Sequence, residues 1–471
     1  MYKRQTLFDH PTISALATLV ESRGVTEVAA SKQASAVAVA PKAAGPILPL
    51  FSLDSSTELE LSNVVVVGAA ARLPGGVSRA GEGLARLLND GVDAIGRVPA
   101  ERWSLHDHFD QERQPGKMYT PFRGFIDGVD RFDASFFRVV RDDAVAMDPS
   151  QRLVLASNWE ALETAGIVPE SLAGTDVGVF VGAMDSDYGL LRAALRLGGR
   201  SPFDATGSST SITCGRVSYF LGTHGPSMSI NTACSSSLVA LHLGSISVRR
   251  RESSVALVSG VSTMLAPDVS LNYSQAGMLS RDGRCKMFDS RASGYVRGEG
   301  VGPLVVVRED SVDHERASVL AMVRASGVNQ DGASNGLTAP SSAAQSRLLR
   351  GVIGGVVDIS AADVSYVECH GTGTGLGDPI EFKSFSAVYG TGERGPLFAT
   401  SMKTNIGHLE AAAGVAGVLR VVSAFRSRAL AASLHFVRPS SAVMWDSAPH
   451  VSVVERLTLW DTKLSLIHIS E

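Results

Sequence analysis

The sequence predicts an α/β protein whose mostly parallel or mixed sheets are covered by helices on their faces. Short apolar runs alternate with helical stretches from residue 64 to the end of the chain, a pattern typical of this class. The first run, residues 64–68 (VVVVG), suits a strand that is buried on both faces. Further strands are expected at residues 177–182, 255–261, 303–308, 319–324, 364–369 and 397–401.

Helix boundaries are marked by capping residues. Asp148 and Pro149 supply an N-cap and a proline at the first helical position, and Gly166 ends that helix. Asp378 and the proline after it are expected to cap another helix, and a further helix is expected after Gly407.

Composition and charge exclude several classes of protein. The formal net charge of −4 is too mild for broad attraction to nucleic acid or to an anionic membrane. The four cysteines contain no Cys-x-x-Cys pair, so neither a disulfide framework nor a zinc site is indicated. No apolar run reaches about 18 residues and no signal peptide is visible. These features suit a reducing compartment, and we expect a cytoplasmic location.

The N-terminal part differs from the rest of the chain. Residues 1–24 contain one amphipathic helix that cannot bury its own apolar face. It is similar to the last helix of an acyl- or peptidyl-carrier domain, although the serine that would carry phosphopantetheine is not in the chain. Residues 25–61 are rich in Ala, Val, Pro and Ser without a helical or strand period, which predicts a flexible linker.

Cys234 lies where a predicted strand meets a predicted helix. Residues 228–232 alternate like a strand, and a turn of small residues, 233–235, follows. The next residues predict a helix that faces the core with Leu238, Val239, Leu241, His242 and Ile246. Unpaired N–H groups and the helix dipole favour a thiolate at such a position. A buried structural cysteine is the alternative, and the choice depends on partners elsewhere in the chain.

Two later segments supply those partners. In residues 367–379 (VECHGTGTGLGDP), a strand is expected to end at His370, where a glycine-rich loop lets the backbone approach a ligand. In residues 401–408 (SMKTNIGH), a second strand runs into a loop and a helix start.

Three ordered motifs, TACSSS, ECHGTGTGLGDPIE and KTNIGHLEAAAG, resemble the signature segments of β-ketoacyl synthases. The match is to the ketosynthase domain of modular polyketide synthases and type I fatty acid synthases. The spacings, 370 − 234 = 136 and 408 − 370 = 38, also fit, and the resemblance covers residues 63–454. It implies a thiolase-like fold of two similar halves in a layered α/β/α/β/α domain, with the ketosynthase domain at residues 62–462. Cys234 would serve the first half, and His370 with His408 the second.

The resemblance implies a role for each residue of the constellation. Cys234 would be the nucleophile that takes an acyl group from a carrier thioester, with its own backbone N–H as one oxyanion donor. His370 and His408 would stabilise the enolate that forms when a malonyl-type thioester loses CO2. The resulting carbanion would attack the acyl group on Cys234. Lys403 matches the family's active-site lysine, with an electrostatic and positional role.

Thr372 and Thr374 match the positions that hydrogen-bond the phosphopantetheine arm, although ordinary turn hydrogen bonding is an alternative for both. A structural salt bridge competes for Lys403. A satisfied core histidine is the alternative for His370 and for His408, and their paired motifs argue against it.

The resemblance also implies what the domain binds. No metal and no directly bound cofactor are expected, because substrates arrive on the phosphopantetheine of a carrier domain. The expected partners are acyl carrier domains, adjacent synthase domains such as an acyltransferase, and a second copy in a homodimer. No nucleic acid and no membrane are expected.

Other histidines and motifs are expected to carry no chemistry. His242 is interpreted as packing, and His106 and His108 as surface residues. Residues 332–336 fit the G-x-S-x-G pattern of hydrolases but lie in a polar loop without the required strand and helix. The loop at residues 371–377 never satisfies G-x-G-x-x-G in register, so a dinucleotide site is rejected.

Competing functions within the family are marked by replaced residues. Loading-type domains that only decarboxylate are marked by replacement of the cysteine, and non-condensing domains by loss of a histidine; this chain has all three residues. A thiolase would not use this histidine pair. The chain departs from the family at its end: the Gly-Phe-Gly-Gly-type segment is absent, and residues 463–471 form an atypical tail. That segment would supply the second oxyanion donor, so the ketosynthase domain is expected to be incomplete at its C-terminus, and whether this fragment is active by itself is left open.

Overall fold

The computed structural model describes residues 63–194, 201–314, 317–390, 396–460 and 466–469. All of them belong to the unit formed by residues 60–471. The expected carrier helix at residues 1–24 and the linker at 25–61 lie outside the described residues, so both remain predictions.

The larger sheet of the described residues is mixed, with strand order β5-β4-β6-β7-β1-β8. β4 is parallel to β5 and β6, whereas β7 is antiparallel to β6 and β1. Every residue of β1 is buried, as its valine run predicts. The strands are β1 (Val64–Ala69), β4 (Val177–Ala183), β5 (Ser227–Ile230), β6 (Val255–Ser262), β7 (Gly300–Arg308) and β8 (Ala321–Val323).

The second sheet has the order β12-β10-β9-β14, and every pairing in it is parallel. Its central strand β9 is flanked by parallel neighbours, as β4 is in the first sheet. β14 lies in the segment expected to be an atypical tail. The strands are β9 (Val364–Glu368), β10 (Leu397–Thr400), β12 (Val451–Val453) and β14 (Leu466–Ile469). Two short ribbons complete the described strands: β2 (Gly96–Arg97) with β3 (Phe122–Arg123), and β11 (Ala429–Leu430) with β13 (Thr458–Leu459).

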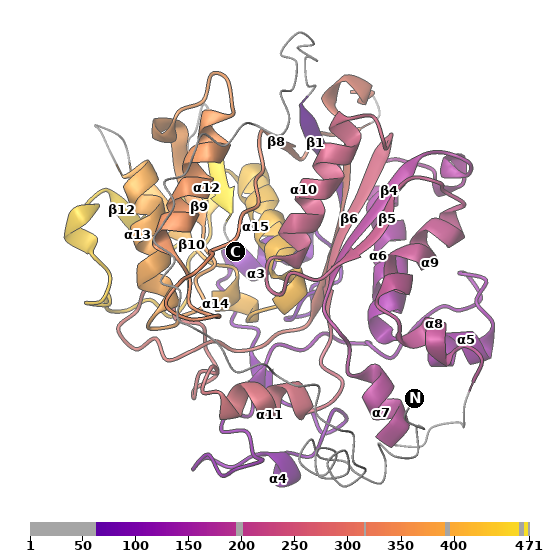
Figure 1. Cartoon of the computed structure of the whole chain (residues 1–471), viewed down its shortest axis with the longest axis horizontal. Helices are drawn as coiled ribbons and strands as arrows, with labels where there is room; N and C mark the ends of the chain where they lie inside the picture. Colours follow the sequence, from indigo (N-terminus) through magenta and orange to yellow (C-terminus); the bar gives the residue numbers. More distant parts are fainter. Residues whose placement is uncertain (1–62, 195–200, 315–316, 391–395, 461–465, 470–471) are drawn as a thin grey trace, which may run out of the picture. The chain divides into compact units, whose positions relative to one another are not determined.

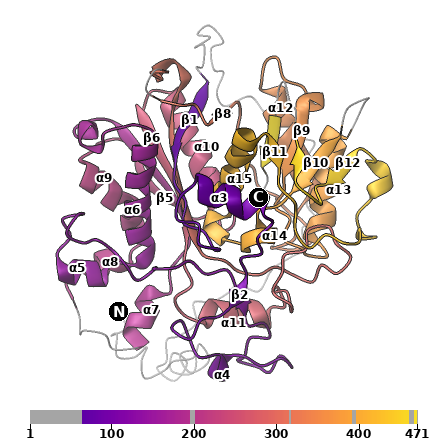
Figure 2. The same cartoon turned by 180° about the vertical axis from the view of Figure 1, so that it is seen from behind.

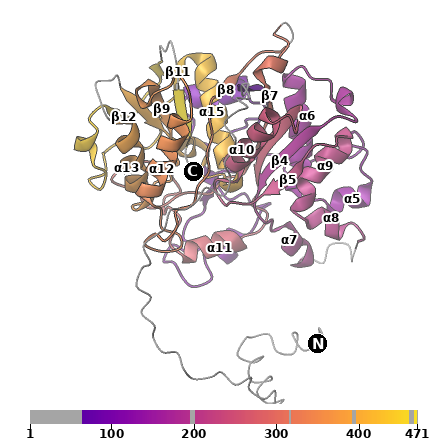
Figure 3. The same ribbon diagram turned by 45° about the horizontal axis from the view of Figure 1, so that its top comes forward.

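Helices cover both sheets and separate them. α10 and α15 stand between the sheets, α6 and α9 cover the outer face of the first, and α12 and α13 lie outside the second (Figure 1, Figure 3). Seen from behind, α3 lies beside α15 (Figure 2). The expected α/β/α/β/α layering is therefore the one observed. The helices are α3 (Glu82–Asn89), α4 (Leu105–His108), α5 (Arg141–Ala146), α6 (Pro149–Thr164), α7 (Tyr188–Ala194), α8 (Asp204–Ser208), α9 (Ser211–Leu221), α10 (Ser236–Arg249), α11 (Asp268–Gln275), α12 (Ser342–Gly354), α13 (Gly377–Tyr389), α14 (Lys403–Ile406) and α15 (Ala413–Ser427).

The predicted boundaries of α6 are confirmed. The Asp148 side chain accepts a hydrogen bond from the backbone N–H of Ser150, 2.7 Å away, and Pro149 occupies the first helical position. Gly166 follows the helix with a φ of 69°, a left-handed conformation that favours glycine.

The predicted core face of α10 is confirmed only in part, since Leu241 is buried and Leu238 packs against the hydrophobic core. Of the five residues expected to face the core, only Leu241 is buried; Leu238, Val239, His242 and Ile246 are half-buried. The buried face is mostly small: Ser236, Ser237, Ala240, Leu241, Gly244, Ser245, Ser247 and Val248. The physical reason is close packing, because a Cβ on Gly244 would lie 2.7 Å from a methyl carbon of Val258 in β6. Small side chains let α10 approach the sheet closely, and several of the larger side chains are only half-buried.

Three other boundaries differ from expectation. α13 begins at Gly377, so Asp378 lies inside its first turn instead of capping it. β9 ends at Glu368, two residues before His370. After Gly407 a 3-10 turn (Glu410–Ala412) precedes α15. Asp378 does not cap α13 because its carboxylate accepts hydrogen bonds from the N–H groups of Gly373 and Thr374 in the preceding loop.

Gly182 is expected to be intolerant of a side chain. A Cβ there would lie 2.5 Å from the backbone nitrogen of Ser237, at the start of α10. Backbone cannot yield as a flexible side chain can, so Gly182→Ala should lower the free energy of unfolding by about 1–3 kcal/mol, measured by urea denaturation. The matched control is Gly215→Ala in α9, where a Cβ meets nothing within 4 Å. This substitution should raise the free energy of unfolding by about 0.5–1 kcal/mol. Equal effects of the two substitutions would contradict this account.

Candidate active site

Cys234 sits on a sharp turn between β5 and α10. Ala233, just before it, has a φ of 55°, an uncommon left-handed conformation for a residue with a side chain. Short polar side chains hold the turn: the Ser236 hydroxyl accepts from the N–H of Thr232 at 2.9 Å and donates to the carbonyl of Ala233 at 2.6 Å. The small polar residues of TACSSS therefore fold the chain so that the sulfur stands at the strand end.

His408 reaches the sulfur from the second half of the domain. Its Nε2 lies 3.1 Å from Sγ of Cys234, although the two residues are 174 positions apart in sequence. The residue is only 2% exposed. Its backbone is held on both sides: its N–H donates to the carbonyl of Val296 at 2.7 Å, and its carbonyl accepts from the N–H of Gly298 at 2.8 Å.

The hydrogen bonds of the His408 ring fix its tautomer. Nδ1 accepts the backbone N–H of Glu410 at 3.0 Å, so a neutral ring carries its proton on Nε2, the atom that faces Cys234. Burial lowers the pKa of His408 well below its ordinary value, and the positive charge of Lys403 adds to this effect. His408 is therefore a neutral N–H donor. It can stabilise a thiolate or an enolate oxygen without adding a fixed cation.

His370 stands beside His408. The two ring centroids are 5.4 Å apart with the planes at 87°. The carboxylate of Glu381 in α13 holds the backbone that carries the ring, accepting the N–H groups of His370 at 2.6 Å and of Gly371 at 2.9 Å. Cys234, His408 and His370 thus border a single site built from both halves of the domain.

Lys403 begins α14 and is 5% exposed. The turn before Lys403 is held by a hydrogen bond to β9, because the N–H of Met402 donates to the Glu368 carboxylate at 2.5 Å. Arg420 of α15 lies 3.4 Å from the same carboxylate and also donates to the side-chain oxygen of Asn405 at 3.1 Å. This buried network fixes the turn. The charge of Lys403 lowers the pKa of His408, and a catalytic role for Lys403 stays a prediction.

Thr372 and Thr374 lie in the glycine-rich loop. The hydroxyl of Thr374 accepts the N–H of Gly377 at 3.1 Å and is 3.3 Å from the hydroxyl of Thr372. These are the turn hydrogen bonds that the alternative interpretation expects. Contact with a phosphopantetheine arm stays a prediction for both residues.

The histidines and the motif expected to carry no chemistry lie apart from this site or make structural contacts. Nδ1 of His242 is 2.9 Å from the hydroxyl of Ser326. The side chain of His106 is 96% exposed, whereas His108 is half-buried. In the G-x-S-x-G segment, the Ser334 hydroxyl donates to the carbonyls of Gly336 and Ala339, so it serves the loop and not a catalytic base.

Sequence reasoning missed the part that acidic residues play in organising the site. Glu381, Glu410 and Asp378 lie among small or apolar neighbours of the second and third motifs, and a carboxylate in such surroundings is the signal that could have identified them. The Asp378 carboxylate accepts N–H groups of Phe288, Gly373 and Thr374 at 2.8–3.2 Å. Burial raises the pKa of Asp378 to about 7.

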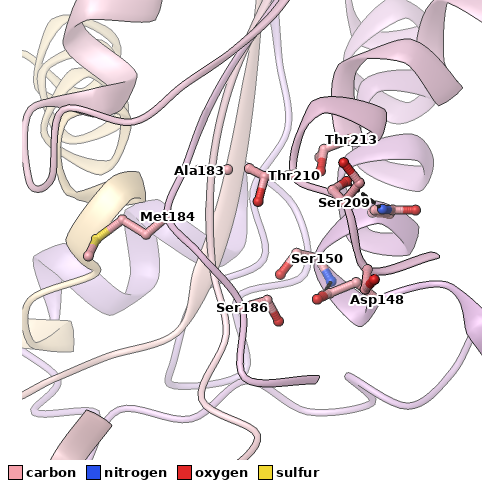
Figure 4. A pocket seen from close by; sticks show the side chains of 10 residues that line it. Asp148, Ser150, Ala183, Met184, Ser186, Ser209, Thr210 and Thr213 are labelled. Atoms are coloured by element: carbon pink, nitrogen blue, oxygen red, sulfur yellow. Dashed lines mark hydrogen bonds between the residues drawn. The ribbon is translucent and has the colours of Figure 1, made fainter. Parts of the chain in front are cut away.

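A small pocket lined mostly by polar residues lies near the end of β4. Figure 4 shows the side chains of Asp148, Ser150, Ser186, Thr210 and other lining residues. None of the predicted site residues lines it.

Within the described parts of the chain, no group of three or more His, Cys, Asp or Glu residues could hold a metal ion. No helix in those parts is long and apolar enough to cross a membrane.

The lowered pKa of His408 predicts a specific dependence of stability on pH. Only the unfolded chain binds a proton at this histidine between the ordinary pKa of 6.5 and the lower folded value. The free energy of unfolding should therefore be unaffected by this residue above pH 6.5. Below that pH it should fall by up to about 1.4 kcal/mol per pH unit.

Urea denaturation of His408→Gln from pH 5 to pH 8 checks this prediction, since the slope due to the histidine should vanish. The quantity compared is the difference in slope between the unchanged chain and His408→Gln below pH 6.5. The same slope in His408→Gln as in the unchanged chain contradicts the assignment.

The comparison with family models divides the chain into the same two halves, one with Cys234 and one with the two histidines. Residues 61–311 match the model for the N-terminal domain of β-ketoacyl synthases, and residues 320–437 match the model for the C-terminal domain. Cys234 thus falls in the first domain and both histidines in the second, as the sequence predicts.

Curated relatives are much longer than this chain. Polyketide synthase GfsE of Streptomyces halstedii is 42% identical over 461 residues, which cover 97% of this chain and 12% of the relative. Phenolphthiocerol synthesis polyketide synthase type I Pks15/1 of Mycobacterium marinum is 44% identical over 401 residues, covering 84% of this chain and 19% of the relative.

Solved structures share the fold. The oxazolomycin ketosynthase domain OzmH KS7 of Streptomyces albus JA3453 superposes with a TM-score of 0.80 at 35% identity, covering 85% of this chain and 70% of that one. The ketosynthase from module 6 of the bacillaene synthase of Bacillus subtilis 168 gives 0.78 at 35% identity, covering 85% and 68%. The chain therefore belongs to the β-ketoacyl synthase family and has the thiolase-like fold of a ketosynthase domain of modular type I polyketide synthases.

Proposed function

We propose that this chain catalyses decarboxylative Claisen condensation in polyketide chain elongation, with Cys234, His370 and His408 as the catalytic residues. The observation that carries the proposal is the 3.1 Å approach of His408 Nε2 to Cys234 Sγ, with the His370 ring centroid 5.4 Å from that of His408. One sulfur and two imidazoles thus share a site that two distant halves of the chain build.

The first step is acyl transfer. The Cys234 thiolate attacks the carbonyl carbon of an acyl thioester on a carrier domain, and the C–S bond to the carrier breaks. The carrier leaves as a thiolate, which takes up the proton that Cys234 lost to solvent when it ionised. The His408 Nε2–H faces the sulfur and stabilises its anionic form. Sulfur is a good leaving group as well as a good nucleophile, so the acyl-enzyme is transient.

The second step makes the carbon–carbon bond. A malonyl-type thioester loses CO2, and the electron pair of the broken C–C bond becomes an enolate whose oxygen accepts N–H donors from His370 and His408. The enolate carbon attacks the acyl carbonyl on Cys234, and the C–S bond breaks to release the thiolate. Burial of His408, with the positive charge of the buried Lys403 as the next cause, lowers the pKa of the ring and keeps it neutral.

Carrier domains would deliver both substrates on phosphopantetheine, and an adjacent acyltransferase would load the extender unit. The similarity to named polyketide synthases supports this assignment of partners. A cytoplasmic location fits the four cysteine thiols of the chain.

A homodimer is part of the proposal. β5 is an edge strand of the first sheet and leads directly to Cys234. Met228 on β5 is 44% exposed and Tyr219 at the end of α9 is 90% exposed, an apolar surface that a second copy would cover. Sedimentation of the 471-residue chain tests this, with Met228→Lys expected to shift the equilibrium towards monomer.

Mass spectrometry of the chain tests the proposed reaction. The chain is incubated with an acyl-carrier thioester and then with a malonyl-carrier. We expect a mass increase on the Cys234 peptide, followed by its loss as a β-ketoacyl-carrier forms with release of CO2. Normal loading without condensation would favour a domain that only passes chains along. Absence of loading would overturn the proposal.

A further inference from the structure

We propose that the ion pair between Arg297 and Glu410 is a positioning device that fixes the proton of His408 on Nε2. Neither residue touches the reacting atoms; both act through the imidazole. The catalytic consequence rests on the proposed function, whereas the effect on the tautomer belongs to the resting chain.

The pair is buried and held at two points. Nε of Arg297 lies 2.5 Å from one carboxylate oxygen of Glu410, and a terminal nitrogen lies 2.9 Å from the other. The side chains are 3% and 9% exposed. A third hydrogen bond, from Arg297 to the hydroxyl of Ser270 at 2.8 Å, secures the guanidinium on α11. The side chain of Glu410 therefore has little freedom to move.

The anchor matters because the backbone of Glu410 is strained. Its φ of 49° is left-handed, a conformation that residues other than glycine rarely adopt. In this conformation its N–H donates to Nδ1 of His408 at 3.0 Å. Without its grip on Arg297, the backbone would relax towards negative φ and turn the N–H away. The ion pair thus holds Glu410 in the conformation in which its N–H donates to Nδ1 of His408. Because Nδ1 accepts this hydrogen bond, it does not carry the proton of the neutral ring.

The same two residues flank the backbone on which His408 rests. Arg297 lies between Val296 and Gly298, whose main chains bond to the N–H and the carbonyl of His408. Glu410 follows His408 by two positions. The ion pair therefore links the two segments that pair through main-chain hydrogen bonds, the one around Arg297 and the one around His408.

Charge around the ring is consistent with a neutral imidazole whose tautomer is selected by hydrogen bonding. The groups that bear on His408 through contact, bonding or charge are Cys234, Tyr295, Lys403, His370, Arg297 and Glu410. Because the Glu410 carboxylate is matched by Arg297, its charge does not draw a proton onto Nδ1.

Two substitutions separate geometry from charge. Glu410→Gln keeps the shape of the side chain but loses the charged two-point grip, so the ratio of the Nε2–H to the Nδ1–H form should fall about tenfold, the worth of one hydrogen bond. Arg297→Lys keeps the positive charge but cannot match both carboxylate oxygens, so the ratio should fall by a smaller factor.

A second buried pair supplies the matched control. Arg102 and Glu299 also form a two-point pair, at 2.8 and 2.9 Å, and the Glu299 side chain is fully buried. Glu299 accepts the N–H groups of Met264 and Ile126 and makes no hydrogen bond to His408 among those of the described residues. Glu299→Gln should cost stability as Glu410→Gln does, and leave the His408 tautomer unchanged.

Nitrogen-15 NMR of the chain labelled at histidine measures the tautomer directly, with the His408 signal assigned by its loss in His408→Gln. The expected result is an Nε2–H ring in the unchanged chain and in Glu299→Gln, and a mixture in Glu410→Gln. An unchanged tautomer in Glu410→Gln, or an equal change in Glu299→Gln, overturns the proposal.

Condensation kinetics give the second readout. Glu410→Gln should lower kcat by about 10- to 100-fold with KM nearly unchanged, because the lost donor geometry acts on the transition state. The two proposals fail separately: a chain that shows the tautomer change but never condenses keeps the positioning role and refutes the proposed function. A chain that condenses with an unchanged tautomer in Glu410→Gln does the reverse.

Discussion

Cys234→Ala should abolish acyl loading and lower condensation by on the order of 10⁴-fold or more, the scale of losing a catalytic nucleophile. The substitution removes the atom that forms the acyl-enzyme and leaves the turn around it intact, since Ser236 and Thr232 hold that turn without the sulfur. Intact-protein mass spectrometry with an acyl-carrier thioester reads the loading directly.

Cys285→Ser is the matched control for this prediction. Cys285 is 1% exposed, and burial raises the pKa of its thiol to about 12, so it is not a thiolate near neutral pH. Its replacement should leave loading within about twofold. If the acyl group persists in Cys234→Ala and disappears in Cys285→Ser, the nucleophile has been assigned to the wrong cysteine.

His370→Ala should separate the two half-reactions, with malonyl decarboxylation falling by about 10²- to 10³-fold, the cost of removing one oxyanion donor. Loading of Cys234 should continue, because His408 supplies the 3.1 Å contact to the sulfur. His408→Ala, in contrast, should impair both steps. Release of labelled CO2 from malonyl-carrier and the mass of the Cys234 peptide measure the two reactions in one sample.

The exposed His106→Ala serves as the control, since its side chain lies at the surface and should affect neither step. Decarboxylation by His370→Ala at the rate of the unchanged chain would remove this histidine from the mechanism. A loss of loading as large as the loss of decarboxylation would show that the two imidazoles do not have separate tasks.

Local sequence was a good guide to several of the local elements, although the expected Asp378 cap was wrong. The valine run of β1, the Asp148 cap of α6 and the glycine that follows it all formed as predicted. The G-x-S-x-G segment was correctly rejected, because its lack of a preceding strand is itself a local feature. Periodicity was only partly reliable at α10, where glycine and serine make up much of the buried face.

The sequence by itself determined the family, since three ordered motifs and their spacing are enough to identify it, and it named the sulfur and the two imidazoles. Only the tertiary structure decided which ring nitrogen faces Cys234, which carboxylates hold the loops, and how Arg297 and Glu410 grip His408. Those properties depend on the direction of single N–H groups and on burial. Two of the deciding contacts, Arg297 with Glu410 and His408 with Cys234, join residues more than a hundred positions apart, which no local pattern of side chains records.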